Sequence, residues 1–184
     1  MPRAGSFMLK KDIGLVLAHL GIGCGDMVVD AGAGSGGLSI FMGNIVGPDG
    51  SVKTYEKNPD FAEIARKNVE NAGLSDIVKV KVKDVFYGFD EPNGSVDAVT
   101  LDMQEAWKMI GEAKRVLKRG GRICAYTVYV EHAKDVHNAL LEKGFFDVET
   151  VEAFTREMEF RAQGSRPKTS RAGHSGYLAF GRKV

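Results

Sequence analysis

The sequence has few of the residues from which disulfide frameworks and metal sites are built. Its only two cysteines, Cys24 and Cys124, form no CxxC pair, and its four histidines show neither an HExxH motif nor a paired cysteine spacing. A disulfide framework needs several cysteine pairs, and structural zinc sites need regularly spaced Cys and His ligands. We therefore expect two structural thiols and no metal.

Long apolar runs and excess charge are lacking as well. No stretch approaches the roughly 18 apolar residues of a membrane-spanning helix, and the opening MPRAGSFMLKKD lacks the apolar centre of a secretory signal. With 25 Lys and Arg against 24 Asp and Glu, the net charge of +1 gives no overall signal for binding a polyanion. We expect a cytoplasmic protein with one domain over residues 1–184 and no membrane partner.

Glycine, by contrast, is abundant, at 23 of 184 residues. Between glycine-rich turns, segments with helical spacing alternate with short apolar runs typical of buried strands. The alternation predicts an α/β fold with a seven-stranded, mostly parallel sheet and helices on both faces. Because no helix separates the last two strands, we expect the final strand to lie antiparallel beside its predecessor. The expected strands are 27–30, 51–56, 77–82, 96–102, 122–129, 146–154 and 175–181, and the expected helices are 11–20 (in a lead-in segment, 1–25), 38–45, one beginning at 59, 107–117 and 131–143.

A glycine-rich turn follows the first expected strand directly. The run 30–37 (DAGAGSGG) joins a strand that ends in the carboxylate of Asp30 to the start of a helix. Glycines let the backbone approach a ligand, and free N–H groups at a helix start point toward it, which is typical of a nucleotide-type site. The spacing fits both G-x-G-x-G and G-x-G-x-x-G, so alone it does not distinguish S-adenosylmethionine from NAD. A turn that only packs strand against helix is the structural alternative.

Carboxylates also follow the next two expected strands. Glu56 ends the second strand, where an acid accepts from both hydroxyls of a cofactor ribose, and Asp84 follows the third, placed to accept from an adenine amino group. Either could instead be a solvated acid at a strand end. With the short chain and the closing antiparallel pair, these features resemble the class I S-adenosylmethionine-dependent methyltransferases. The expected cofactor-binding residues are Asp30, Gly32, Gly34, Ser35, Gly36, Gly37, Leu38, Glu56, Lys57, Asp84, Val85 and Asp102.

Four further motifs occur in order along the chain. They are the run 11–14 (KDIG), the run 55–62 (YEKNPDFA), Leu101-Asp102 with Trp107, and Arg166-Pro167 followed by 173–178 (GHSGYL). Together they resemble, over nearly the whole chain, the catalytic domain of the tRNA adenine-N1 methyltransferase family (TrmI type), which methylates T-loop adenosines at tRNA position 58 and, in archaea, also 57. The resemblance implies a Rossmann-like fold, S-adenosylmethionine as cofactor, tRNA as a partner and a homotetramer.

The resemblance also implies a catalytic residue, Asp102, at the end of the fourth expected strand. Adenine N1 carries a free lone pair, so its methylation depends on in-line placement and on stabilising the positive charge that develops on the base. A carboxylate beside the cofactor suits both needs, because it accepts from the exocyclic amine and faces the cationic product. A helix N-cap or a packing acid is the structural alternative.

Substrate contacts are expected on aromatic and basic side chains. Trp107 is placed to stack on a base extruded from folded tRNA, unless it only anchors its helix in the core. Residues 155–184 hold seven Lys and Arg against two Glu, and the segment 161–173 is expected to be a polar loop that offers cations to phosphates, or else a solubilising loop or subunit contact. The expected substrate-binding residues are Trp107, Arg156, Arg166, Lys168, Arg171 and His174.

The chain departs from the family pattern in three places. Gln104 and Ala106 stand where the family usually has prolines, and Leu9-Lys10 replaces a Tyr-Pro pair. The small β-rich domain that members carry at the amino end has no counterpart here, which leaves room for a separate RNA-binding chain. Two other functions stay open: a precorrin-type small-molecule methyltransferase, and a non-catalytic subunit that binds the cofactor or tRNA.

Overall fold

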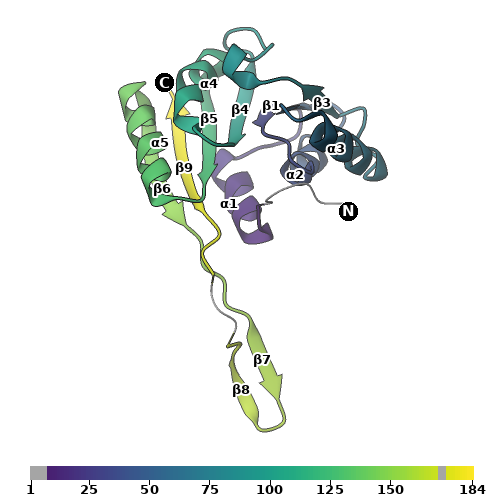
Figure 1. The fold of residues 1–184 in the computed structure, drawn as a ribbon, viewed down its shortest axis with the longest axis vertical. Coiled ribbons are helices and arrows are strands. Elements are labelled where there is room, and N and C mark those ends of the chain that lie inside the picture. Colours follow the sequence, from purple (N-terminus) through teal and green to yellow (C-terminus); the bar gives the residue numbers. More distant parts are fainter. Residues whose placement is uncertain (1–7, 170–172) are drawn as a thin grey trace.

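The computed structural model describes residues 8–169 and 173–184. One sheet has the strand order β3-β2-β1-β4-β5-β9-β6, and the hairpin of β7 and β8 lies apart from it (Figure 1). The strands are β1 (Met27–Ala31), β2 (Ser51–Glu56), β3 (Val78–Val82), β4 (Val96–Asp102), β5 (Leu117–Thr127), β6 (Phe145–Glu152), β7 (Met158–Arg161), β8 (Gly164–Pro167) and β9 (Tyr177–Lys183). The helices are α1 (Lys10–Leu20), α2 (Gly37–Val46), α3 (Pro59–Asn71), α4 (Ile110–Val116) and α5 (Val130–Glu142), with 3-10 turns η1 (Val85–Tyr87) and η2 (Ala106–Met109).

The pairing of the strands confirms the predicted fold class. Strands β1 to β5 pair in parallel, and β9 runs antiparallel to its neighbours. As expected, β9 lies beside its predecessor β6. It also lies beside β5, because Ala179 is opposite Ala125 on one side and Thr150 on the other. The last strand is therefore inserted within the sheet rather than added at its edge.

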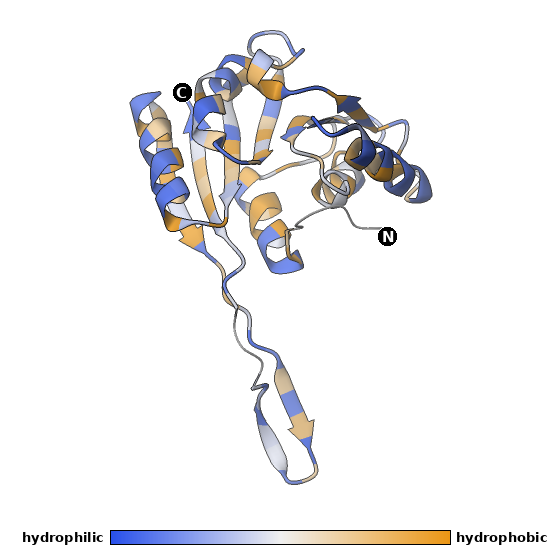
Figure 2. Cartoon of the chain, in the orientation of Figure 1, coloured by the Kyte–Doolittle hydropathy of each residue, from blue (hydrophilic) through white to orange (hydrophobic). Residues whose placement is uncertain are grey.

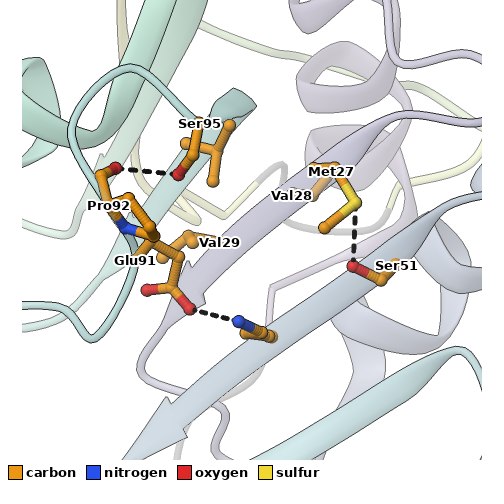
Figure 3. A pocket seen from close by; sticks show the side chains of 9 residues that line it. Met27, Val28, Val29, Ser51, Glu91, Pro92 and Ser95 are labelled. Carbon is orange, nitrogen blue, oxygen red and sulfur yellow. Dashed lines mark hydrogen bonds and ion pairs between the residues drawn. The ribbon is translucent and has the colours of Figure 1, made fainter.

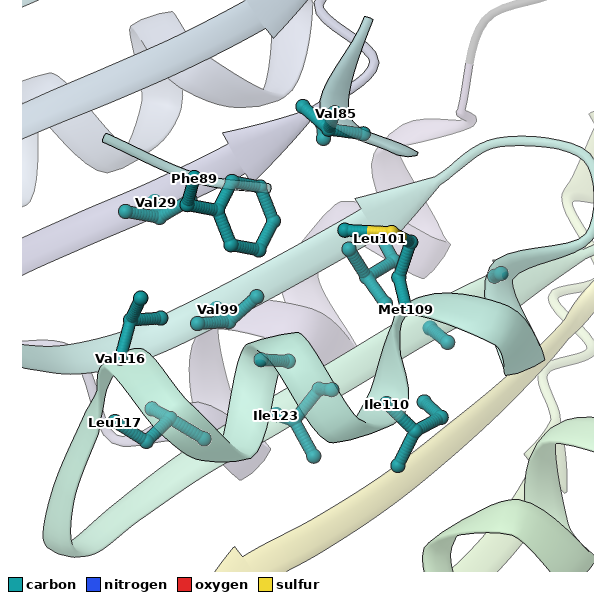
Figure 4. Close-up of a cluster of buried hydrophobic side chains, with 14 of the residues drawn as sticks. Val29, Val85, Phe89, Val99, Leu101, Met109, Ile110, Val116, Leu117 and Ile123 are labelled. Atoms are coloured by element: carbon teal, nitrogen blue, oxygen red, sulfur yellow. The ribbon is translucent and has the colours of Figure 1, made fainter. Parts of the chain in front are cut away.

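Helices cover both faces of the sheet, as the sequence predicts. Because successive strand residues point to opposite faces, neighbours in β1 belong to different cores. Val28 packs with Met42 in the core beneath α1, α2 and α3. Val29 packs with Ile110 and Val99 in the core beneath α4 and α5 (Figure 4). All five side chains are almost fully buried, and burial of each contributes roughly 1.5–3 kcal/mol.

The segment 161–173 is not the polar loop that we expected from the sequence. Its first part belongs to a hairpin in which Met158 is opposite Pro167 and Phe160 is opposite Ser165. This hairpin, residues 158–167, extends away from the body of the molecule, and we call it the arm (Figure 1). Hydrophobic and hydrophilic residues alternate along β7 (Figure 2). The alternation covers only four residues in a charged region, so charge obscured the strand pattern.

The expected helix 107–117 and the strand after it are also shifted. The segment starts with the 3-10 turn η2, so α4 begins only at Ile110, and β5 begins at Leu117 instead of 122. A register irregularity between Val96 and Ala98 and a left-handed Gly120 (φ +81°) accommodate the earlier start. None of the helices in the described ranges has the length and apolar character that a bilayer crossing requires.

Candidate functional site

The glycine-rich turn lies at the carboxyl edge of the sheet, between the ends of β2 and β4. Gly32 N donates to Asp102 O at 3.2 Å, and Ala33 N donates to Tyr55 O at 2.9 Å. Parallel strands end at one edge, so the turn, Glu56 and Asp102 come together there, as the sequence predicts. A pocket of about 100 Å³ lies at the opposite edge, where Met27 and Ser51 begin their strands (Figure 3).

Two glycines of the turn have different roles. A Cβ on Gly32 would lie 3.4 Å from Glu56 Oε2 and 3.6 Å from Asp102 O, so a side chain there would fill the space between the two acids. Gly36 adopts the left-handed region (φ +79°) at the start of α2, where a Cβ would lie 3.4 Å from Ala65 of α3. Gly32 therefore keeps the site open, whereas Gly36 lets two helices pack closely.

Asp30 is buried beneath the turn, with 1% of its surface exposed. Its Oδ2 accepts from the hydroxyls of Ser39 and Thr54, each at 2.7 Å, and its Oδ1 accepts from Thr100 at 2.5 Å. Burial raises the pKa of Asp30, against the effect of these donors, which lower it. The carboxylate thus ties β1, β2, β4 and α2 together under the turn. Its place in the cofactor-binding set remains a prediction.

Glu56, at the end of β2, is almost fully buried with its carboxylate in the site. Oε2 accepts from Gly34 N at 2.9 Å, and Oε1 accepts from Asn58 N at 3.0 Å. A carboxylate oxygen has two acceptor positions, so each oxygen can accept one more hydrogen bond. The geometry therefore suits two neighbouring hydroxyl groups, such as those of a ribose. Lys57 follows on the exposed surface.

Asp84 lies at the end of the next strand along the sheet edge. Its Oδ1 accepts from Phe86 N at 3.0 Å and so caps the turn η1, while Val85 is buried in the core. This cap gives Asp84 a structural role that was not predicted from the sequence. The second oxygen of Asp84, Oδ2, takes no part in the hydrogen bond to Phe86 N. Contact between Asp84 and an adenine amino group stays a prediction. Ser35 is buried, and its carbonyl accepts from Asn68 at 2.9 Å.

Asp102 is the last residue of β4 and lies next to the glycine turn. Its surroundings disfavour the ionised form of its carboxyl group. Burial, the charge of Asp30 and the charge of Glu56, in that order, raise the pKa of Asp102 to about 7. Perturbed carboxylates in a cleft are typical of functional sites, because such a setting is unfavourable for folding alone. A positive charge placed here would relieve the repulsion between the acids. The site therefore suits a cationic ligand or a reaction that develops positive charge.

Trp107 belongs to an aromatic group that the sequence did not reveal. Its ring lies 4.9 Å from that of His132 in α5, and His132 lies 5.4 Å from Tyr129 in an edge-on arrangement. Tyr129 is 62% exposed, and Trp107 is partly buried against the core. Tyr129 follows Tyr126, which pairs in register with Asp102, by three residues. The exposed apolar run 128–130 just after a strand was the available signal for this group.

Arg166 lies in the arm, which extends away from the body of the molecule that holds Asp102 (Figure 1). Arg166 pairs with Glu159 at 3.5 Å, and Lys168 pairs with Glu157 at 2.6 Å. Arg156 is exposed, and Arg171 lies outside the described residues. Within the part of the chain that the structure describes, Arg166 and Lys168 are therefore paired with glutamates rather than brought to the cofactor edge.

His174 contacts the end of β6 and the residue that follows β5. Its Nδ1 lies 2.5 Å from Glu152 Oε1, and its Nε2 lies 2.7 Å from the carbonyl oxygen of Val128. The bond to Glu152, followed by that to Val128, raises the pKa of His174. This residue therefore connects the end of β6 to the segment just after β5, near Tyr129.

Methyltransferases of the class I, Rossmann-like fold share this sheet and this cofactor edge, and the chain has that fold. The sequence profile of one methyltransferase family, described as tRNA methyltransferase complex GCD14 subunit, matches residues 2–166. The chain belongs to this family, which confirms the family predicted from the sequence.

Individual proteins agree with this assignment. The tRNA (adenine(57)-N(1)/adenine(58)-N(1))-methyltransferase TrmI of Methanocaldococcus jannaschii is 35% identical, over 99% of this chain and 73% of that protein. The structure of the tRNA (m1A58) methyltransferase TrmI from Aquifex aeolicus matches with a TM-score of 0.91 at 25% identity, over 100% of this chain and 72% of the other. A SAM-dependent O-methyltransferase from Thermotoga maritima matches with a TM-score of 0.93 at 31% identity, over 98% and 67%. A precorrin 8w decarboxylase, at 20% identity and a TM-score of 0.81, shares the fold alone.

Proposed function

We propose that this protein transfers a methyl group from S-adenosylmethionine to N1 of an adenosine in the T-loop of tRNA, at position 57/58. The observation that carries the proposal is the position of Asp102. It is the last residue of β4, and its backbone carbonyl accepts a hydrogen bond from Gly32 of the glycine turn. Membership of the tRNA methyltransferase family supports the acceptor.

The residues at the edge of the sheet fit S-adenosylmethionine. The space that a Cβ on Gly32 would fill lies between Glu56 and Asp102, and Glu56 retains acceptor positions for two ribose hydroxyls. When bound, this cofactor supplies a methyl group on a positively charged sulfur, and the positive charge passes to the base with the methyl group. Clustered acids suit a site that holds positive charge before and after the transfer.

Asp102 has two roles in this chemistry. Its carboxylate accepts from the exocyclic amine of adenine, which orients N1 along the line of transfer. It also stabilises the charge that develops on the ring, because it faces the base from a partly desolvated position. Since positive charge in the site lowers the pKa of Asp102 from about 7, the ionised form predominates at neutral pH in the loaded enzyme.

The aromatic group of Trp107, His132 and Tyr129 forms the proposed wall for the acceptor base. Exposed Tyr129 and partly buried Trp107 offer ring faces at the same sheet edge as Asp102. Extruded bases stack on aromatic rings, and a cationic purine gains further from an electron-rich ring face. This wall would stand in for the aromatic residue that Leu9-Lys10 replaces.

A second copy of this chain is the proposed partner of the arm, in line with the expected homotetramer. Phe154, Met158 and Phe160 are 68%, 50% and 79% exposed, and the strand edges of the arm have no pairing partner within the described residues. Exposed apolar residues beside open strand edges favour protein association. Phe160→Ser is expected to shift sedimentation toward smaller species, whereas Leu141→Ser, at an exposed apolar site on the helix α5, is the matched control.

The basic residues are proposed to assist tRNA binding from around the arm. Arg166, Lys168 and His174 are already ion-paired with glutamates, so the exposed Arg156 carries more of this proposal. Arg171 remains part of the proposal and lies outside the described residues. A cytoplasmic location and a separate RNA-binding chain remain part of the proposal. Residues 1–184 are proposed to act as one catalytic domain.

Incubation with labelled S-adenosylmethionine and unmodified tRNA tests the proposed function. We expect label in tRNA, mapped by nuclease digestion to position 57 or 58. The control variants are Asp102→Asn, which should lose most transfer, and Asp97→Asn at the other end of β4, which should retain it. Label in a corrinoid precursor instead would favour the precorrin-type function, and cofactor binding without transfer to either acceptor would favour a non-catalytic subunit.

A further inference from the structure

Asp12, in the first turn of α1, is a buried carboxylate with 0% of its surface exposed. Its Oδ1 pairs with Lys11 Nζ at 2.7 Å. Its Oδ2 has no hydrogen-bond partner among the described residues. A buried polar atom left without a partner destabilises a protein, and more so when it is charged. A donor from a ligand would remove this penalty.

Residues on both sides of Asp12 in the chain line the proposed transfer site. Met8 and Val16, four residues before and after it, line a narrow hollow together with Asp102 and Tyr126. Burial raises the pKa of Tyr126 to about 12, and the charges of Asp12 and Asp102 add to the effect. The carboxylate of Asp12 is therefore close to the ends of β4 and β5.

The order of the strands sets the direction in which the cofactor extends. Asp84, Glu56, the glycine turn and Asp102 follow β3, β2, β1 and β4, which are successive strands of the sheet. With adenine at Asp84 and ribose at Glu56, an extended cofactor directs its amino-acid end toward β4 and β5. That part of the edge is covered by α1, which packs against β5 and α2. The amino-acid end therefore approaches Asp12.

We propose that Asp12 Oδ2 binds the α-ammonium group at the amino-acid end of the cofactor. The proposal rests on the proposed function, because it assumes the same cofactor orientation. An ammonium group is a suitable donor, since hydrogen bonds between two charged groups are stronger than neutral ones. Lys11 fixes the carboxylate from the other side, because its Nζ also donates to Ala153 O at 2.7 Å and to Ser175 Oγ at 2.6 Å.

Calorimetric titration with three ligands tests this assignment. The ligands are S-adenosylhomocysteine, its desamino analogue and methylthioadenosine, which lacks the amino-acid end. Asp12→Asn is expected to weaken S-adenosylhomocysteine by about 10- to 100-fold and to leave methylthioadenosine unchanged. The desamino analogue should bind the wild type and the variant equally. Asp97→Asn is the matched control, because it removes a carboxylate paired with a lysine, Lys118, at the other end of β4, and it should leave all three affinities unchanged.

Three results would separate the possible failures. Equal binding of S-adenosylhomocysteine to the wild type and to a folded Asp12→Asn would overturn the assignment while leaving the proposed function intact. If the variant fails to fold, the wild type decides, because equal affinity for S-adenosylhomocysteine and its desamino analogue would also overturn it. A wild type that binds neither S-adenosylmethionine nor S-adenosylhomocysteine would instead refute the proposed function.

Discussion

Replacing Asp102 by asparagine removes a carboxyl group at the end of β4 whose ionised form is disfavoured in the site. Its pKa rises from 3.8 to about 7, because burial and the charges of Asp30 and Glu56 disfavour ionisation. In the unfolded chain the group has its ordinary pKa, so the folded protein binds the proton more tightly. Stability is therefore lost as the pH rises from about 4 to about 7. At 1.36 kcal/mol per pKa unit, the loss is about 4 kcal/mol above pH 7.

The variant has no such titration, so its stability relative to the wild type should change with pH. About 1.5 kcal/mol of the loss has already occurred by about pH 5, which leaves roughly 2.5–3 kcal/mol between about pH 5 and 8. Urea unfolding of the protein without cofactor, at several pH values in this range, measures the difference in the free energy of unfolding. The free energy of unfolding of Asp102→Asn, relative to that of the wild type, is expected to grow by roughly 2.5–3 kcal/mol over this pH range.

The matched control is Asp97→Asn, at the other end of β4, where the carboxylate pairs with Lys118 at the surface. Its stability difference should stay flat over the same range. A constant advantage of Asp102→Asn from about pH 5 to 8 would refute the reasoning, because it would mean that the carboxylate titrates near its ordinary pKa. In transfer assays Asp102→Asn should lose at least about 100-fold in rate, with little change in S-adenosylhomocysteine affinity.

Three further substitutions test other parts of the site. Glu56→Gln should weaken S-adenosylhomocysteine about tenfold by calorimetry, because a neutral amide is a poorer acceptor for ribose hydroxyls. Trp107→Ala should raise the KM for tRNA while cofactor affinity stays unchanged, and an unchanged KM would exclude base stacking on this ring. In Gly176→Ala the new Cβ would lie 2.4 Å from the Tyr126 ring, so thermal melting should show a loss of roughly 1–3 kcal/mol.

The parts of the fold that depend on local pattern were predictable from the sequence. Alternating helix and strand spacing predicted the sheet, and the glycine run predicted the turn after β1. Glu56 was predictable because an acid at the end of a strand must lie at the edge where parallel strands end together. Position along the chain thus sufficed for groups that follow neighbouring strands.

Features that depend on distant contacts were not predictable. Asp30 has three hydroxyl partners, and two of them, Thr54 and Thr100, come from strands far along the chain. The meeting of Trp107 with His132 requires α5 to pack against η2, which no local spacing encodes. The insertion of β9 between β5 and β6 likewise depends on which edges remain open after the other strands have paired.

That insertion also sets an order for folding during synthesis. A chain made from its amino end completes β5 and β6 well before β9 exists, so β5 has one open edge and β6 has no strand partner in the main sheet during that interval. Only when Tyr177–Lys183 has left the ribosome can both edges be closed in one step. Until then, the open edge of β5 and the unpaired β6 are available for pairing with other chains. A slow step between the emergence of β6 and that of β9 would therefore increase aggregation of the newly made protein.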